Sequence, residues 1–134
     1  MYVILDSTIL VSIAINTLKP IAQAWRQGVF IVLVSKEMLS ELREVLYRDK
    51  FRRWLTLENT EDFLQELVFL TESIEIQQPF PEFDDPKDRY ILAMLEDDTA
   101  ELLVTSDKAL LRLYSHAGKA IVHPSDFVSL YLLE

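Results

Sequence analysis

Short apolar runs alternate along the chain with longer segments whose apolar residues recur at helical spacing. Continuous apolar runs at residues 2–5, 30–34, 102–104 and 120–122 are typical of buried strands in a parallel sheet. A further strand is expected at residues 73–76. Because helices are expected between the strands, the pattern predicts an α/β fold with a parallel sheet of about five strands and helices on both faces.

The helices are predicted from apolar periodicity and from residues that favour helix ends. They are expected at 9–14, from Lys19-Pro20 to Gly28, after Ser35, from Asn59 or Thr60, from Asp85-Pro86 to about 95, from Asp107 to 114–116, and from Pro124. Val68, Leu130 and Leu133 are expected to face the core. Residues 77–85 contain two prolines and should form a loop.

Composition favours a single domain over residues 1–134. No apolar run approaches the ~20 residues of a membrane span, and no signal peptide is visible, so a cytoplasmic setting without membrane contact is expected. The absence of cysteine excludes thiolate zinc sites and cysteine nucleophiles. With only Gly28 and Gly118, the chain also lacks the closely spaced glycines of the Walker and dinucleotide-binding loops.

Four acidic residues stand at the edges of apolar segments. Asp6 follows the first strand, Asp107 follows the strand at 102–104, and Glu41 and Asp88 lie on expected helices. Ligands of open α/β sheets bind beyond the carboxyl ends of the strands, so these acids are expected to meet in one crevice. Several carboxylates stay ionised together only if a cation offsets their repulsion, and oxygen ligands favour Mg²⁺ or Mn²⁺.

Each acid also has a purely structural interpretation, because acids are common at helix starts. It is the set of four, in this order and on these elements, that favours a shared site. Asp84 and Asp85 compete with Asp88 for the third position. Asp88 is preferred because its helix phase places it with the apolar residues of the same helix.

The formal net charge of −9 disfavours non-specific binding to nucleic acid. Charge is uneven, however, since five basic residues fall within eleven positions: Arg43, Arg48, Lys50, Arg52 and Arg53. Two interpretations remain open. The cluster forms a patch that holds a phosphodiester strand beside the acids, or it is an exposed helix end favoured by the helix dipole.

Five segments, in order, resemble the PIN domain family. They are residues 3–12 with Asp6, 35–46 with Glu41, 85–93 with Asp88, 104–111 with Asp107, and the closing 121–127. The similarity covers essentially the whole chain and is closest to the branch of toxins from toxin–antitoxin pairs. It implies the PIN-like three-layer α/β/α arrangement.

The resemblance implies a Mg²⁺- or Mn²⁺-dependent ribonuclease that hydrolyses RNA phosphodiester bonds. Asp6, Asp88, Asp107 and Glu41 would then be the catalytic and metal-binding residues. Ser7, Thr8, Thr105 and Ser106 would support them by hydrogen bonds. The resemblance also implies a homodimer and a small antitoxin whose basic side chain enters the acidic crevice.

Two positions depart from the family pattern. Ser7-Thr8 stand where the family has Thr-Asn, which predicts reduced activity. Arg89 stands where an acid is common, and would either weaken metal binding or clamp a phosphate. These departures keep open a PIN-like binding or regulatory module with weak or no nuclease activity. A phosphotransfer domain is disfavoured, since Thr8 stands where a haloacid-type phosphatase needs its second Asp.

Overall fold

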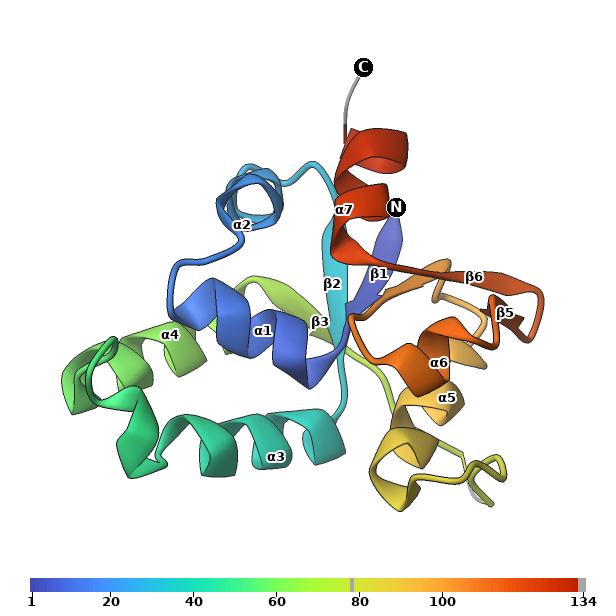
Figure 1. Cartoon of the computed structure of the whole chain (residues 1–134), viewed down its shortest axis with the longest axis horizontal. Helices are drawn as coiled ribbons and strands as arrows, with labels where there is room; N and C mark the ends of the chain where they lie inside the picture. The colour runs from blue at the N-terminus through green and yellow to red at the C-terminus, as the bar shows by residue number, and fades with distance from the viewer. Residues whose placement is uncertain (78, 133–134) are drawn as a thin grey trace.

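The computed structural model describes residues 1–77 and 79–132, and its centre is a six-stranded sheet (Figure 1). The strand order is β3-β2-β1-β4-β6-β5. Neighbouring strands run parallel except for β5 and β6, which are antiparallel. The strands are β1 (Tyr2–Leu5), β2 (Ile31–Val34), β3 (Thr71–Ser73), β4 (Leu102–Val104), β5 (Ser115–His116) and β6 (Lys119–Val122). The prediction of an α/β fold around a mainly parallel sheet is confirmed.

Helices flank the sheet, and short irregular turns connect them (Figure 1). The helices are α1 (Ser7–Ala14), α2 (Lys19–Arg26), α3 (Lys36–Leu46), α4 (Leu57–Phe69), α5 (Arg89–Leu95), α6 (Lys108–Leu111) and α7 (Pro124–Phe127). Single turns of 3₁₀ helix form η1 (Asp49–Phe51) and η2 (Pro86–Asp88), and η3 (Val128–Leu132) is a π-helical turn. Within the described residues, no helix has both the length and the apolarity needed to cross a membrane.

The core lies around the two central strands, β1 and β4. Every residue from Val3 to Leu5 and from Leu102 to Val104 is buried, as expected of parallel strands covered on both faces. The end of α7 closes the core, where the rings of Phe30 and Phe127 meet edge to face at 5.1 Å between centroids. These contacts fix the sheet whose carboxyl edge carries the predicted site.

Some predicted boundaries are confirmed, and others are shifted, including the start of α1, which lies at Ser7 rather than at residue 9. The Ser35 hydroxyl caps α3 by accepting the Met38 amide at 3.2 Å, as predicted. Helix α4 begins earlier than expected, because Thr56 rather than Asn59 or Thr60 is its cap and accepts the Asn59 amide at 3.0 Å. Strand β3 spans Thr71–Ser73 rather than the predicted 73–76, because the chain pairs with β2 directly after α4, and residues 74–76 lie beyond its end.

Two side chains expected in the core are exposed. Val68 is 63% exposed because α4 covers the sheet edge at β3 and leaves its outer face in solvent. Leu130 is 71% exposed because the π-helical turn η3 is wider than an α-helical turn and changes the phase of the side chains. The third expected core residue, Leu133, lies outside the described residues.

The region after β4 also differs from the prediction. Helix α6 ends at Leu111, and residues 115–116 form the edge strand β5. Ala117 and Gly118 form the two-residue turn between β5 and β6, with φ angles of 55° and 76°. Two consecutive positive φ angles are typical of the type I′ turn that closes tight hairpins. A strand of two residues is too short to show the alternation that predicts a strand.

Candidate metal centre

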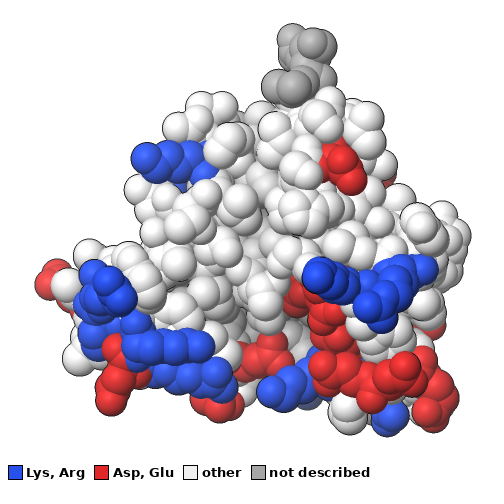
Figure 2. All heavy atoms as spheres, in the orientation of Figure 1, with Lys and Arg blue, Asp and Glu red and all other residues white. Residues whose placement is uncertain are grey.

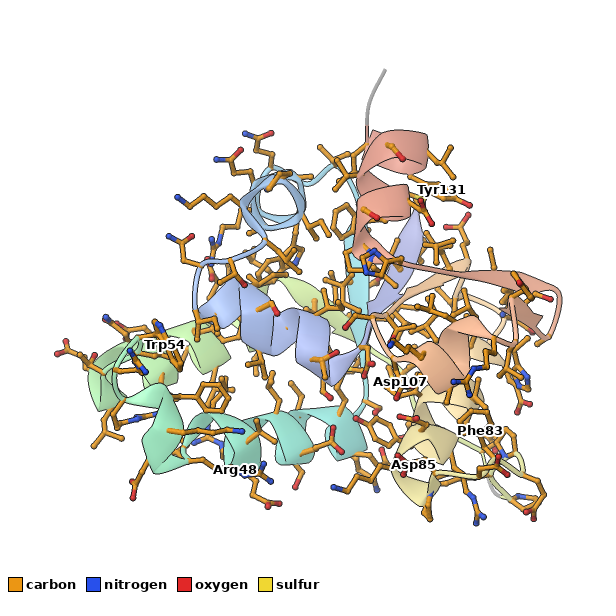
Figure 3. All side chains as sticks on the ribbon, in the orientation of Figure 1. Arg48, Trp54, Phe83, Asp85, Asp107 and Tyr131 are labelled. Carbon is orange, nitrogen blue, oxygen red and sulfur yellow. The ribbon has the colours of Figure 1, made fainter. Side chains whose placement is uncertain are left out.

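The strand order places a crevice between β1 and β4. The chain leaves β1 toward β2 on one side, whereas β4 and β6 extend the sheet on the other side. Loops therefore diverge at the carboxyl ends of β1 and β4, which is where open α/β sheets bind ligands. Asp6 follows β1 directly, and Asp107 is the third residue after β4. Figure 3 shows Asp107 near the ends of α1, α3 and α5.

All four predicted acids line one pocket of about 310 Å³, which we call the acidic pocket. Segments far apart in sequence supply them: the end of β1, the middle of α3, the last residue of η2 and the cap of α6. The other lining residues are Ser7, Thr8, Glu44, Val45, Arg48, Asp85, Lys87, Tyr90 and Ile91. The sequence prediction that these carboxylates meet at one edge of the sheet therefore agrees with the structure.

Asp6 is the least exposed of the four acids, with 5% of its surface accessible to solvent. Its Oδ2 accepts a hydrogen bond from the Thr105 hydroxyl at 2.7 Å. The hydroxyls of Ser7 and Thr8 approach the same carboxylate at 3.5 Å and 3.4 Å, which are long for hydrogen bonds. Burial raises the pKa of Asp6, the Thr105 hydrogen bond opposes this rise, and the nearby charges of Asp107 and Glu41 add to it.

Asp107 combines a structural contact with a place in the pocket. Its Oδ1 accepts the backbone amides of Ala109 at 2.8 Å and Leu110 at 3.4 Å, so it caps α6. Its own amide donates to the Thr105 hydroxyl at 3.0 Å. The capping interpretation and the functional one are therefore compatible, because the cap fixes the carboxylate at the pocket wall.

Asp88 is the acid whose environment is least compatible with a bare negative charge. It is 8% exposed, and its Oδ2 is buried with no hydrogen-bond partner among the described residues. Burial, hydrogen bonding to Asp107 and the charges of Asp107, Asp6 and Asp85 together raise the pKa of Asp88 to about 7. A buried, unpartnered carboxylate oxygen of this kind is costly unless a proton or a cation satisfies it.

Glu41 is held by a residue that the sequence did not suggest. The hydroxyl of Tyr90 donates to Glu41 Oε1 at 2.9 Å. The Tyr90 ring is buried, and burial together with the Glu41 charge raises its pKa well above the ordinary value, so it stays a donor. Forty-nine positions separate the two residues, so no local spacing could have revealed the pair. The only available signal was that a buried tyrosine hydroxyl needs a partner.

The donors of the acidic pocket fit a hard divalent cation. They are carboxylate oxygens, which Mg²⁺ and Mn²⁺ prefer, and the unpartnered Oδ2 of Asp88 is a buried acceptor that a cation would satisfy. Over residues 1–77 and 79–132, however, no three His, Asp or Glu side chains form a ready ligand cluster. Binding an ion would therefore require the carboxylates that line the pocket to change rotamer.

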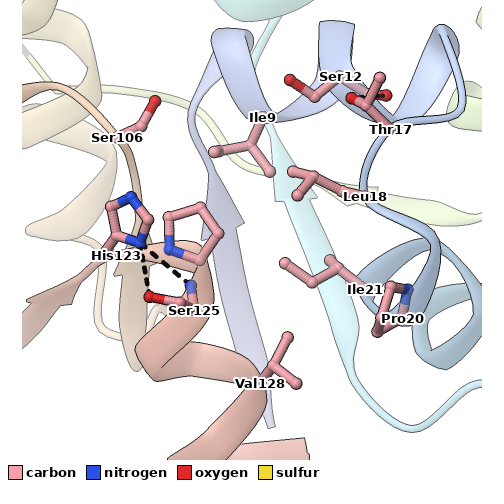
Figure 4. A pocket seen from close by; sticks show the side chains of 11 residues that line it. Ile9, Ser12, Thr17, Leu18, Pro20, Ile21, Ser106, His123, Ser125 and Val128 are labelled. Atoms are coloured by element: carbon pink, nitrogen blue, oxygen red, sulfur yellow. Dashed lines mark hydrogen bonds between the residues drawn. The ribbon is translucent and has the colours of Figure 1, made fainter.

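The remaining candidate residues differ in whether they line the acidic pocket. Ser106 is exposed and lines a separate, mostly apolar pocket beside α1 and α7 (Figure 4). Arg89 is not among the residues of the acidic pocket, and its Nε donates to the Phe83 carbonyl at 3.1 Å. Asp85 lines the acidic pocket and also caps η2, accepting the Lys87 amide at 3.0 Å, whereas Asp84 is exposed outside it.

A family model described as the PIN domain matches residues 2–109. The chain belongs to the PIN domain family. The resemblance seen in the sequence is thereby confirmed, and PIN domains are generally nucleases. Comparison with curated proteins gave no significant sequence match.

Two solved structures share the fold of this PIN domain at low sequence identity. One is VapBC2 from Rickettsia felis bound to a DNA fragment from its promoter, with a TM-score of 0.62 and 16% identity, covering 92% of this chain and 98% of that one. The other is the PIN domain of human SMG5, with a TM-score of 0.54 and 14% identity, covering 98% of this chain and 99% of that one. At these identities the likeness concerns the fold alone.

Proposed function

We propose that this PIN domain is a Mg²⁺- or Mn²⁺-dependent endoribonuclease that hydrolyses RNA. The observation that carries the proposal is the convergence of Asp6, Glu41, Asp88 and Asp107 on one pocket at the carboxyl edge of the sheet. The nuclease activity general to PIN domains supports the reaction class. The crowded carboxylates, with a raised pKa at Asp6 and Asp88, support a divalent cation.

In this proposal Asp6, Asp88 and Asp107 hold the cation, and Glu41 binds it or orients the attacking water. A bound Mg²⁺ or Mn²⁺ supplies an acidified water and offsets negative charge on the phosphoryl oxygens. Thr105 keeps Asp6 oriented through its 2.7 Å hydrogen bond, and Tyr90 does the same for Glu41 at 2.9 Å.

The basic residues of the pocket would hold the substrate phosphates. Lys87 is exposed at the rim and makes no ion pair with any described residue. Arg48, which follows α3, is also exposed and makes only a long 3.5 Å contact to Glu44. Surface pairs of this kind contribute little, so Arg48 can exchange its carboxylate for a phosphate at small cost.

The cleavage assay uses purified protein, single-stranded RNA and Mn²⁺. We expect the native chain to cleave the RNA and the Asp6→Asn and Asp107→Asn variants to lose at least a hundredfold in rate. Asp98→Asn is the matched control, because Asp98 is exposed and outside the pocket, and it should cleave as the native chain does. Equal activity in native, Asp6→Asn and Asp107→Asn proteins would refute the assignment.

We further propose that the chain is the cytoplasmic toxin of a toxin–antitoxin pair, acts as a homodimer and binds a small antitoxin. The net charge of −9 and the acidic pocket favour a partner that presents basic side chains. Expression of the chain alone should arrest growth, and coexpression of a small protein encoded beside it should restore growth. Light scattering of the purified chain tests the dimer.

A second candidate function is a binding module with weak or no catalysis. The long contacts from Ser7 and Thr8 to Asp6 favour it, because they leave this carboxylate supported mainly by Thr105. Calorimetric titration with Mn²⁺ separates the two candidates. Tight binding that depends on Asp107 contradicts the module, whereas absent binding together with absent cleavage supports it.

A further inference from the structure

A second open pocket begins at Lys108, the residue that follows Asp107 of the acidic pocket. It measures about 460 Å³, and its walls come from α6, β6 and the residues that follow each of them. We call it the α6 pocket and define it by Lys108, Arg112, Tyr114, His123 and Asp126. Figure 2 shows basic side chains gathered over α6 immediately beside the acidic side chains of the cleavage region. The two pockets therefore present opposite charges along one surface.

Lys108 and Arg112 are the cations of this pocket, and neither is paired with an acid among the described residues. They are four positions apart, so their side chains emerge from the same face of α6 and its cap. Both are exposed, and neither makes an ion pair with any residue that the structure describes. Asp126 is the one acid that lines the pocket, so the two cations outnumber the carboxylates there.

Tyr114 presents a rigid aromatic ring to solvent beside these cations. It is 81% exposed and has a φ angle of 60°, a conformation that a bulky residue adopts at a cost. Its backbone is fixed on both sides, because its amide donates to the Leu111 carbonyl at 3.1 Å and its carbonyl accepts the Ile121 amide at 2.9 Å. An exposed ring held by an anchored backbone suits a flat ligand such as a nucleobase.

His123 also lines this pocket. Its Nδ1 accepts the Ser125 amide at 3.1 Å and lies 2.9 Å from the Ser125 hydroxyl (Figure 4). Because Nδ1 accepts the Ser125 amide, a ring hydrogen is carried on Nε2. In Figure 4 the ring nitrogen that is not bonded to Ser125 lies on the side facing Ser106, the residue that precedes Asp107.

Most side chains of the basic cluster noted in the sequence already contact other residues of the protein. Arg43 pairs with Glu61 at 3.0 Å, and Arg52 donates to the Leu46 carbonyl. Lys50 lies over the Phe51 ring at 5.2 Å, and Arg53 lies over the Trp54 ring at 4.8 Å from its centroid. These contacts make the cluster near η1 a poorer phosphate site than α6, apart from Arg48 at the acidic pocket itself.

Resting on the proposed nuclease function, we propose that the α6 pocket binds single-stranded RNA beside the cleavage site. Lys108 and Arg112 contact phosphates of the strand that leaves the acidic pocket, and Tyr114 stacks on one of its bases. A single strand is required, because stacking on Tyr114 needs a base that is free of its duplex neighbours. The local pair of cations offsets the repulsion that a net charge of −9 exerts on the phosphates.

The test measures RNA binding separately from cleavage. The full chain carrying Asp6→Asn is titrated into a fluorescein-labelled single-stranded RNA of mixed sequence, and binding is followed by the fluorescence anisotropy of the RNA. In this background Lys108→Ala/Arg112→Ala should weaken binding about tenfold or more and lower the salt dependence by roughly 1.4 in log–log slope. Tyr114→Ala should weaken binding about tenfold, and Tyr114→Phe should retain it because the ring remains.

Lys50→Ala/Arg53→Ala is the matched control, since it removes the same charge from the other basic cluster. It should change binding less than twofold. The proposal is overturned if the α6 double variant binds like its parent, or if both double variants weaken binding equally. Failure of the nuclease function looks different: the native chain would cleave no RNA with any divalent metal, while binding in the Asp6→Asn background would still depend on α6.

Discussion

The hydroxyl of Thr105 joins the ends of the two central strands, because it donates to Asp6 Oδ2 at 2.7 Å and accepts the amide of Asp107 at 3.0 Å. One buried side chain thus fixes one acid through its carboxylate and the other through its backbone. Thr105 therefore links the acid that follows β1 to the acid that follows β4.

Thr105→Val should separate these roles from packing, since valine has nearly the same shape. The variant leaves the Asp107 amide and Asp6 without their partner, which should lower the free energy of unfolding by about 1–3 kcal/mol. Cleavage should fall roughly 10- to 100-fold, as for other residues that orient metal ligands. Urea denaturation and the RNA assay measure both effects. Thr105→Ser keeps the hydroxyl and should restore most of the activity; if Thr105→Val behaves like it, the hydroxyl has no such role.

The raised pKa of Asp88 predicts that the stability of the metal-free protein depends on pH. Its pKa is about 7 in the folded protein and near 3.8 when unfolded, so between these values the folded state binds the extra proton. Stability should therefore fall as pH rises from about 4 to about 7 and then level off. Thermal unfolding in the presence of a chelator should show a lower melting temperature at pH 8 than at pH 5.

The Asp88→Asn variant tests the source of this dependence. The neutral amide removes the buried charge, so the metal-free variant should melt several degrees above the native chain at pH 8 and close to it at pH 5. Saturating Mg²⁺ should stabilise the native chain at pH 8 and leave Asp88→Asn nearly unchanged. Identical pH profiles for the two proteins would exclude Asp88 as the titrating group.

The Tyr90 hydroxyl should affect cleavage chiefly by orienting Glu41. Tyr90→Phe removes the 2.9 Å hydrogen bond and keeps the buried ring, so we expect about 1 kcal/mol of lost stability and a several-fold lower cleavage rate. Tyr47→Phe is a suitable comparison, because the Tyr47 hydroxyl bonds to Glu61 on the surface outside the acidic pocket. If both variants change the cleavage rate equally, Tyr90 does not orient Glu41.

The sequence predicted the parts of the site that follow from position along single elements. Asp6 and Asp107 stand where strands end, and Asp88, which was expected on the inward face of a helix, is 8% exposed as the last residue of the 3₁₀ turn η2. Contacts between distant segments left no such signal, as with Tyr90 and Glu41 or Thr105 and Asp6. In a sequence Lys108 and Arg112 look like an ordinary helix end, and only the hairpin of β5 and β6 places Tyr114 beside them.

We propose that the acids of this PIN domain hold one divalent cation together. Electron paramagnetic resonance of free Mn²⁺ measures this directly, because ions bound to the protein no longer contribute to the sharp signal of the hexaaqua ion. We predict saturable Mn²⁺ binding by the native chain and by Asp98→Asn, and its loss in Asp6→Asn/Asp107→Asn. Equal Mn²⁺ uptake by the double variant and the native chain would contradict the account.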